Sequence, residues 1–165
     1  MTQQVSRSRF TTLSPDEVWK IYNNVNGIFR GGGGSNAPKL MRADGPRRTD
    51  LHIFTDLATR MEMVHPNSTM GLSFADSIEV LAKKKIEGWV WVIPKGRSLP
   101  EGLVFNVAAL DHPLLNVGRV MSVLDMMARL TLLAEMMEPC NVKIDKLGKI
   151  VESSPGSLAN VAKKW

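Results

Sequence analysis

Arg30 is the first residue in the chain whose type and surroundings suggest chemistry. It ends a short apolar segment and is followed by four glycines, the first of which is Gly31. Glycine lets a ligand approach the backbone closely and takes positive φ without strain. A guanidinium group beside such a run can bind a pyrophosphate through paired hydrogen bonds. The alternative is a flexible linker, because the run reads Gly-Gly-Gly-Gly-Ser and matches no GxGxxG motif.

A second candidate set consists of four consecutive residues: Gly71, Leu72, Ser73 and Phe74. We expect a strand edge here, followed at once by a helix over residues 75–84, in which apolar residues recur at helical spacing. Ser73 is the predicted N-cap of that helix. After a Glu-Gly helix end, residues 89–93 are aromatic and β-branched, which predicts a strand that contains Trp91.

The elements that must position these residues predict an α+β protein. Ser-Pro-Asp-Glu at residues 14–17 is a helix start signal, so a first helix is expected at residues 15–24. Strands are predicted at residues 28–30, 50–54, 60–64, 89–93, 103–110 and 114–117, with a small strand pair within residues 142–151.

A long helix is predicted at residues 120–138, and it is rich in methionine and apolar over most of its surface. A wide stripe that includes Leu124, Met127 and Leu132 is predicted to face the core, with Met126 and Leu130 outside it. A Met-rich helix can also serve as an adaptable binding surface. Core packing is the preferred interpretation, with part of the second face available to a partner protein.

A basic loop, residues 36–48, separates the glycine run from the first predicted strand pair. It contains Lys39, Arg42 and Arg47. The preferred interpretation is a mobile surface segment, and the alternative is a lid or a substrate-facing arm. In either case its positive charges attract a ligand that carries phosphate.

Length and composition indicate one domain at residues 1–152, followed by a basic tail at residues 153–165. The 21 Lys and Arg against 16 Asp and Glu give a net charge of +5, which favours nucleotides, nucleic acid or acidic proteins as partners. A single cysteine, Cys140, excludes an internal disulfide framework. His52 and His65 belong to no metal-binding motif, so no metal site is predicted.

The sequence also bears on localisation. No apolar run reaches the length of a membrane-spanning helix, so no membrane insertion is expected. The N-terminal segment is polar and basic without a following apolar region, so no signal peptide is predicted. We therefore expect synthesis in the cytoplasm, and export, if it occurs, by a dedicated secretion system.

Several segments resemble a family of bacterial toxins delivered by type VI secretion, the second of the exported effectors, which are built like ADP-ribosyltransferases. The residues that carry the resemblance are Gly-Leu-Ser-Phe-Ala-Asp at 71–76, Val-Ile-Pro-Lys-Gly at 92–96, Leu-Pro-Glu-Gly-Leu at 99–103, Pro-Arg-Arg-Thr-Asp at 46–50, and His112 before the last long helix. The resemblance implies an ADP-ribosyltransferase-like α+β fold. Its short, mostly antiparallel strands would form a split two-sheet core flanked by about three helices, with NAD in the cleft between the sheets.

The resemblance also implies roles for individual residues. Arg30 would bind the phosphates of NAD, and Ser73 would support the nicotinamide ribose or the geometry of its strand. His112 is the third candidate catalytic residue. The implied NAD-binding residues are Arg30, Gly31, Gly71, Leu72, Ser73, Phe74 and Trp91, with Phe74, Trp89 or Trp91 as the wall beside the nicotinamide.

The sequence departs from the ADP-ribosyltransferase pattern at the catalytic glutamate. Residues 103–110 contain no acid, and Asn106 is their only polar side chain. The nearest candidates are Glu101, Asp111 and His112.

The function that the resemblance implies is a cytotoxic effector that uses NAD to modify a protein or nucleic acid in the cytosol of a rival or host cell. Its partner would be a cognate immunity protein of acidic character. The alternatives are a non-catalytic or differently acting toxin of the same fold, and a basic domain that binds nucleic acid or protein.

Overall fold

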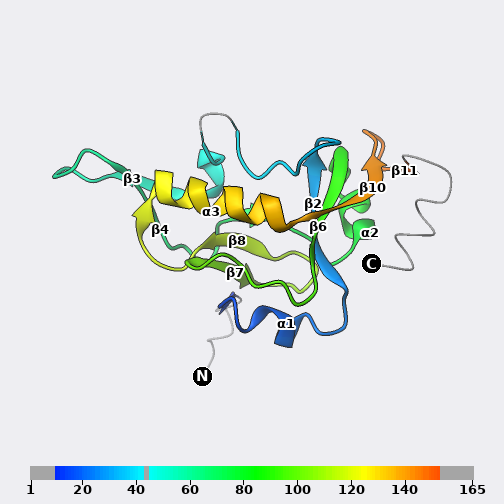
Figure 1. The fold of residues 1–165 in the computed structure, drawn as a ribbon, viewed down its shortest axis with the longest axis horizontal. Coiled ribbons are helices and arrows are strands. Elements are labelled where there is room, and N and C mark those ends of the chain that lie inside the picture. The colour runs from blue at the N-terminus through cyan, green and yellow to red at the C-terminus, as the bar shows by residue number, and fades with distance from the viewer. Residues whose placement is uncertain (1–9, 43–44, 153–165) are drawn as a thin grey trace, which may run out of the picture.

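The computed structural model describes residues 10–42 and 45–152, and the predicted tail at residues 153–165 lies outside them. Within the described residues the chain is α+β, with three α-helices and three antiparallel sheets (Figure 1). The predicted α+β class is therefore confirmed, although the structure has three sheets where two were predicted. None of the described helices has the length and apolar character needed to cross a membrane.

The three sheets are best introduced by their strand order. The first sheet has the order β1 (Thr11–Leu13), β7 (Leu103–Val107), β8 (Leu114–Val117) and β5 (Leu72–Ser73). The second sheet has the order β11 (Ile150–Glu152), β10 (Glu138–Ile144), β6 (Gly88–Pro94) and β2 (Gly27–Gly33). The third sheet contains β3 (His52–Thr55), β4 (Glu62–His65) and β9 (Met121–Ser122). β5 and β2 are thus edge strands, the two strands that carry Ser73 and Arg30.

The third sheet exists because the chain remains extended up to the start of the last helix. Val64 pairs with Met121 and Met63 with Ser122. The Ser122 hydroxyl accepts a hydrogen bond from the amide of Asp125 at 3.0 Å, which makes Ser122 the N-cap. The helix therefore begins after Ser122, and the predicted start at residue 120 is wrong.

The last helix, α3 (Val123–Met136), crosses the front of the molecule between the β3–β4 hairpin and β10 (Figure 1). Its buried residues are Val123, Met126, Leu130 and Leu133, which belong to the main hydrophobic core. The predicted stripe is wrong, because Leu124 is 69% exposed and Leu132 is 56% exposed. Both faces are apolar, so hydrophobic spacing alone could not identify the buried one.

The two shorter helices also differ from their predicted limits. In α2 (Ile78–Lys83) the N-cap is Ser77, whose hydroxyl accepts from the Val80 amide at 3.3 Å. The prediction of Ser73 as N-cap is therefore wrong, and its hydroxyl is available for another contact. α1 (Val18–Ile21) is shorter than predicted, although the Glu17 carboxylate accepts a hydrogen bond from the Ser14 amide at 2.9 Å. A short 3₁₀-helix, η1 (Arg48–Asp50), precedes β3.

Three of the four glycines of the run belong to β2, so the run is not a linker. Gly33 pairs with Trp89 across the second sheet, after an irregularity in register that follows Arg30. The chain turns only at Gly34, whose amide donates to the carbonyl of Ala37 at 3.0 Å. A Cβ atom on Gly33 would lie 2.7 Å from Cδ1 of Trp91 and 2.9 Å from the carbonyl oxygen of Trp89. Glycine is required at this position because the Trp91 ring packs against the backbone.

We expect Gly33→Ala to lower the free energy of unfolding by about 1–3 kcal/mol, the usual cost of overpacking a close contact. Gly34→Ala is the matched control, because its nearest neighbour would be the Ala37 carbonyl at 3.7 Å. Urea denaturation of both variants measures the difference. Equal stabilities would mean that the run does not continue the strand.

Candidate functional site

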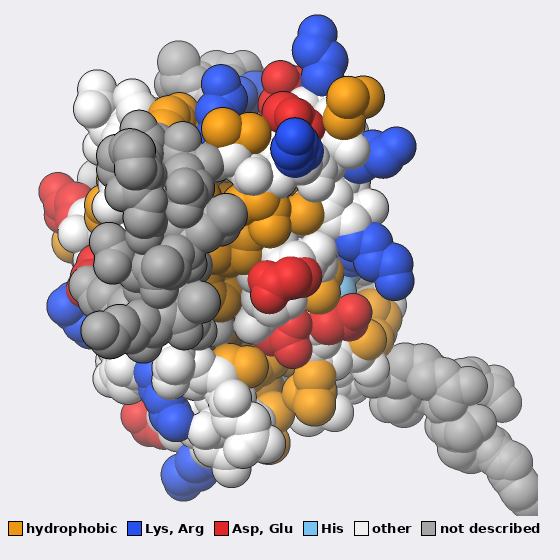
Figure 2. Space-filling view, turned by 90° about the vertical axis from the view of Figure 1, so that its right-hand side faces the viewer, with side chains coloured by type: hydrophobic (Ala, Val, Ile, Leu, Met, Phe, Trp, Pro, Cys, Tyr) orange, Lys and Arg blue, Asp and Glu red, His pale blue; other side chains and the backbone are white. Residues whose placement is uncertain are grey.

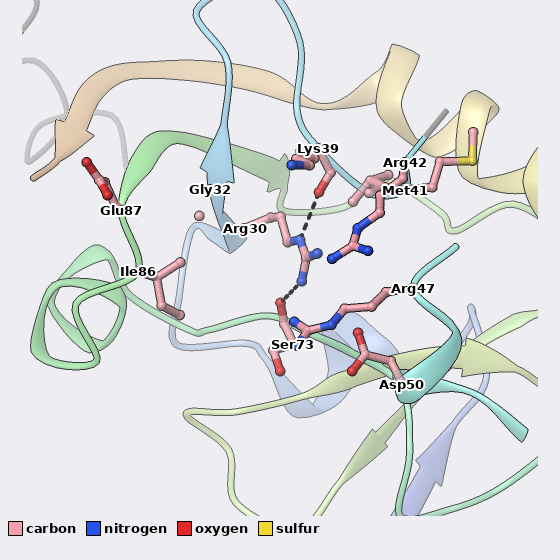
Figure 3. A pocket seen from close by; sticks show the side chains of 12 residues that line it. Arg30, Gly32, Lys39, Met41, Arg42, Arg47, Asp50, Ser73, Ile86 and Glu87 are labelled. Carbon is pink, nitrogen blue, oxygen red and sulfur yellow. Dashed lines mark hydrogen bonds between the residues drawn. The ribbon is translucent and has the colours of Figure 1, made fainter. Parts of the chain in front are cut away.

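A cavity of about 430 Å³ lies beside the end of β2, and we call it the Arg30 cavity. Its volume is within the range of small-molecule sites. Figure 3 shows it from close by. The lining residues are Arg30, Gly31, Gly32, Lys39, Leu40, Met41, Arg42, Arg47, Asp50, Ser73, Ile86 and Glu87.

Arg30 crosses from the second sheet to the first. Its Nη1 donates to the backbone carbonyl of Ser73 at 2.6 Å, and its Nε donates to the carbonyl of Lys39 at 3.2 Å. The guanidinium group lies over the ring of Phe74, 5.6 Å from the ring centroid. Arginine has five N–H donors, so these two bonds leave donors to bind an anion in the cavity.

The charges around Arg30 favour an anionic ligand. Four cationic and two acidic side chains line the cavity, and Figure 3 shows the guanidinium groups of Arg30, Arg42 and Arg47 pointing into it. Burial lowers the pKa of Arg30, Asp50 opposes that shift, and Arg47 lowers the pKa further. Because arginine stays charged at neutral pH, a bound anion would relieve the repulsion between these cations.

The third predicted catalytic residue, His112, contacts the site through the side chain of Ser73. The Ser73 hydroxyl oxygen lies 3.1 Å from Nε2 of His112, and Nδ1 of His112 lies 2.7 Å from Nζ of Lys84. A protonated lysine only donates hydrogen bonds, so Nδ1 must accept and the imidazole proton sits on Nε2. His112 therefore donates to the Ser73 hydroxyl.

This tautomer determines what Ser73 can do. A nucleophilic serine needs a histidine nitrogen that accepts its proton. The Nε2–H of His112 is already a donor, so the hydroxyl hydrogen of Ser73 stays on the oxygen and can be donated to a ligand. Burial first and the charge of Lys84 second lower the pKa of His112, while Asp111 opposes the shift. The arrangement therefore suits hydrogen bonding rather than covalent catalysis.

The structure brings together the three candidate catalytic residues but only part of the predicted NAD-binding set. Arg30, Gly31 and Ser73 line the cavity, and His112 and Phe74 contact its lining residues. Three others pack in the interior: Gly71, Leu72 and Trp91. The indole nitrogen of Trp91 donates to the Gly34 carbonyl at 2.9 Å, so Trp91 supports β2 and is not a wall of the cavity.

Sequence reasoning missed the two acids of the cavity, Asp50 and Glu87. Glu87 belongs to no motif, and Asp50 ends the Pro-Arg-Arg-Thr-Asp segment, for which the resemblance implied no role. Each of the two acids lies far in sequence from Arg30. The positive charge of the basic loop was the sequence feature that could have identified further cavity residues, because Lys39, Arg42 and Arg47 line the cavity. That placement fits the interpretation as a substrate-facing arm.

The acidic residues closest in sequence to the missing catalytic glutamate, Glu101 and Asp111, are not among the residues that line the Arg30 cavity. Glu101 is bound by Arg119 at 2.6 Å and by Arg129 at 3.3 Å, and Asp111 is exposed. The amide nitrogen of Asn106 donates to the carbonyls of Asn67 at 3.0 Å and Met70 at 3.4 Å. Asn106 therefore holds the loop that leads into β5.

Comparisons of the chain with protein-family models, curated proteins and solved structures gave no match. Among residues 10–42 and 45–152 no group of three or more His, Cys, Asp and Glu side chains could hold a metal ion. The geometry of the cavity is therefore the basis for assigning a function.

We expect Lys84→Met to raise the pKa of His112 towards its ordinary value of 6.5, because the substitution removes a nearby positive charge. NMR titration of the imidazole measures the shift. Lys83→Met is the matched control, since Lys83 is an exposed neighbour on the same helix. A pKa that moves equally in both variants would contradict the contact.

The same contact predicts how stability depends on pH. A lowered histidine pKa means that the unfolded chain takes up the proton first as the pH falls. Neutral His112 therefore makes its full contribution to the free energy of unfolding above pH 6.5. This contribution decreases as the pH falls from 6.5 towards the lowered pKa of the folded state. Lys84→Met should make this decrease smaller.

Proposed function

We propose that this chain is an ADP-ribosyltransferase-like toxin domain that binds NAD in the Arg30 cavity. One observation carries the proposal: Arg30, within the early strand β2 and just before an irregularity in its register, faces a cavity that also contains Ser73, further cations and two carboxylates. Arg30 belongs to the second sheet and Ser73 to the first, so the proposed NAD site lies where two sheets meet.

The proposed ligand accounts for the charges of the cavity. The free donors of Arg30 would bind the pyrophosphate, with Arg42 and Arg47 on the rim neutralising its remaining charge. The Ser73 hydroxyl, held by His112, would donate to an oxygen of the nicotinamide ribose. Because His112 and Lys84 act through Ser73, they are positioning residues and not catalytic ones.

The reaction breaks the bond between ribose C1′ and the nicotinamide nitrogen, and the bonding electrons leave with nicotinamide. A nucleophile on the acceptor, or water, forms the new bond to C1′ and loses a proton. Asp50 is the carboxylate proposed to take that proton, because it lines the cavity on the side of Ser73 and Arg47 in Figure 3. Glu87 lies at the opposite end of the cavity in Figure 3.

The toxin role includes a partner and a route. An effector of this kind acts in the cytosol of another cell after export, and its producer needs an immunity protein. An acidic partner would approach the cationic rim of the Arg30 cavity rather than the face that contains α2. Figure 2 shows acidic side chains gathered on that face, and burial together with the charges of Asp111 and Glu79 raises the pKa of Asp76. The exposed Leu124 and Leu132 of α3 provide apolar area for the same contact.

We expect Arg30→Ala to weaken NAD binding about ten- to a hundred-fold, since a hydrogen bond to a charged group contributes about 1.5–3 kcal/mol. Arg30→Lys should restore only part of it, because an ammonium group lacks the planar fork. Isothermal titration calorimetry measures both affinities. Arg97→Ala, outside the cavity, controls for the lost charge.

Thermal unfolding must accompany this titration, because Arg30→Ala also removes donors from the carbonyls of Ser73 and Lys39. Arg47→Gln leaves both bonds in place and should still weaken NAD binding. The proposal fails if folded wild-type protein does not bind NAD at millimolar concentration, or if Arg30→Ala and wild type bind equally.

The two cavity carboxylates provide a second test. We expect Asp50→Asn to slow the release of nicotinamide from NAD by about 10²–10⁴-fold, the usual contribution of a general base, with little change in NAD affinity. Glu87→Gln should have a small effect, so it is the matched control. Chromatographic detection of nicotinamide measures the rate. NAD binding without release in the wild type would favour the non-catalytic toxin.

A further inference from the structure

A second cavity adjoins the Arg30 cavity, and we call it the arginine cleft. It has a volume of about 270 Å³ and is lined by Arg42, Pro46, Arg47, Arg48 and Thr49. Arg42 and Arg47 line both cavities, so the two spaces share a wall. Unlike the Arg30 cavity, the arginine cleft has no acidic side chain among the described residues that line it.

Two of the three arginines of the cleft, Arg47 and Arg48, are held in place before any ligand binds. Nε of Arg47 donates to the Thr49 hydroxyl at 3.2 Å. Arg48 donates to Glu62 on β4 from Nη1 to Oε1 at 3.0 Å and from Nη2 to Oε2. Pro46, which directly precedes these arginines in the sequence, is buried. Charged groups whose positions are fixed in advance lose less conformational freedom on binding.

The composition of the cleft indicates the kind of ligand. Protein–protein interfaces have an apolar centre with aromatic anchors, and Pro46 is the only apolar residue in the part of this lining that the structure describes. Interfaces with nucleic acid are more polar and strongly positive, and guanidinium groups match phosphate oxygens in pairs. The cleft therefore suits a phosphodiester backbone better than a protein surface.

The position of the cleft relates it to the proposed chemistry. Asp50, the proposed base, and Arg48 belong to the same short helix, η1. Asp50 lines the Arg30 cavity while Arg48 lines the arginine cleft. A strand whose phosphates occupied the cleft would therefore lie next to the carboxylate that accepts its proton.

We propose that the arginine cleft binds the phosphates of a nucleic-acid strand and that this strand is the acceptor of ADP-ribose. The inference rests on the proposed function of the neighbouring cavity. A base nitrogen or hydroxyl of the strand attacks ribose C1′ of NAD, nicotinamide leaves with the bonding electrons, and the proton of the nucleophile passes to Asp50.

Fluorescence anisotropy tests the binding step with a short single-stranded RNA, a DNA of the same sequence, and polyglutamate of similar charge. Wild-type protein should bind the nucleic acids more tightly than polyglutamate. Arg48→Gln should weaken RNA binding about tenfold and lower the slope of log affinity against log salt by about one. NAD affinity, measured by calorimetry, should not change in this variant.

Glu62→Gln is the matched control, because it breaks the same ion pair and keeps Arg48. RNA binding should be unchanged or tighter in this variant. A loss equal to that of Arg48→Gln would mean that the pair matters only for folding, and this would overturn the assignment. Equal binding of polyglutamate, or no binding of RNA and DNA by folded wild-type protein, would also overturn it.

Mass spectrometry of the oligonucleotides after incubation with NAD tests the transfer step. A gain in mass equal to ADP-ribose on the RNA or the DNA identifies the acceptor, and unmodified strands with continued nicotinamide release would overturn the acceptor role. If the strands bind but NAD does not, the proposed function fails while the phosphate site is supported. The two failures are thus distinguishable.

Discussion

The structure depends on the connection between β2 and β5, the edge strands that carry Arg30 and Ser73. Phe29 and Ala75 exchange backbone hydrogen bonds of 2.7 and 2.8 Å, and Arg30 adds its bond to the Ser73 carbonyl. Unpaired backbone groups at buried strand edges are costly, so these bonds keep the first and second sheets together. The Arg30 cavity lies beside this connection, and its shape depends on it.

The buried guanidinium group of Arg30 loses its hydration at this connection, and contacts within the protein must replace it. The guanidinium group has two carbonyl acceptors and lies over Phe74, whose ring also packs edge-to-face on Phe105 with centroids 5.3 Å apart. An arginine that keeps donors after these contacts can serve the fold and a ligand at once. The same residue is therefore structural by its bonds, and its remaining donors are the ones that the proposed function uses.

The sequence was a good guide to the order of elements and a poor guide to side-chain faces. Gly88–Pro94 and Leu114–Val117 follow from aromatic, apolar and β-branched patterns, whereas β2 continues through Gly33, beyond the predicted strand at residues 28–30. The buried face of α3 could not be predicted, because Leu124 and Met126 are equally apolar in the sequence and only packing separates them. For the site, Arg30 and Ser73 came from a resemblance, whereas Asp50 and Glu87 meet there only through tertiary structure.

Asn106 explains why an acid is absent where an ADP-ribosyltransferase pattern requires one. Its amide nitrogen donates to the carbonyls of Asn67 and Met70, and Asn116 donates to the same two carbonyls at 3.3 and 2.9 Å. A carboxylate has no donors, so an acid at this buried position would face those carbonyls without a bond. The loop into β5 therefore favours an amide at residue 106, and the carboxylate that the proposed function needs has to come from another element. Asp50 of η1 lines the cavity and is the carboxylate that we propose for this role.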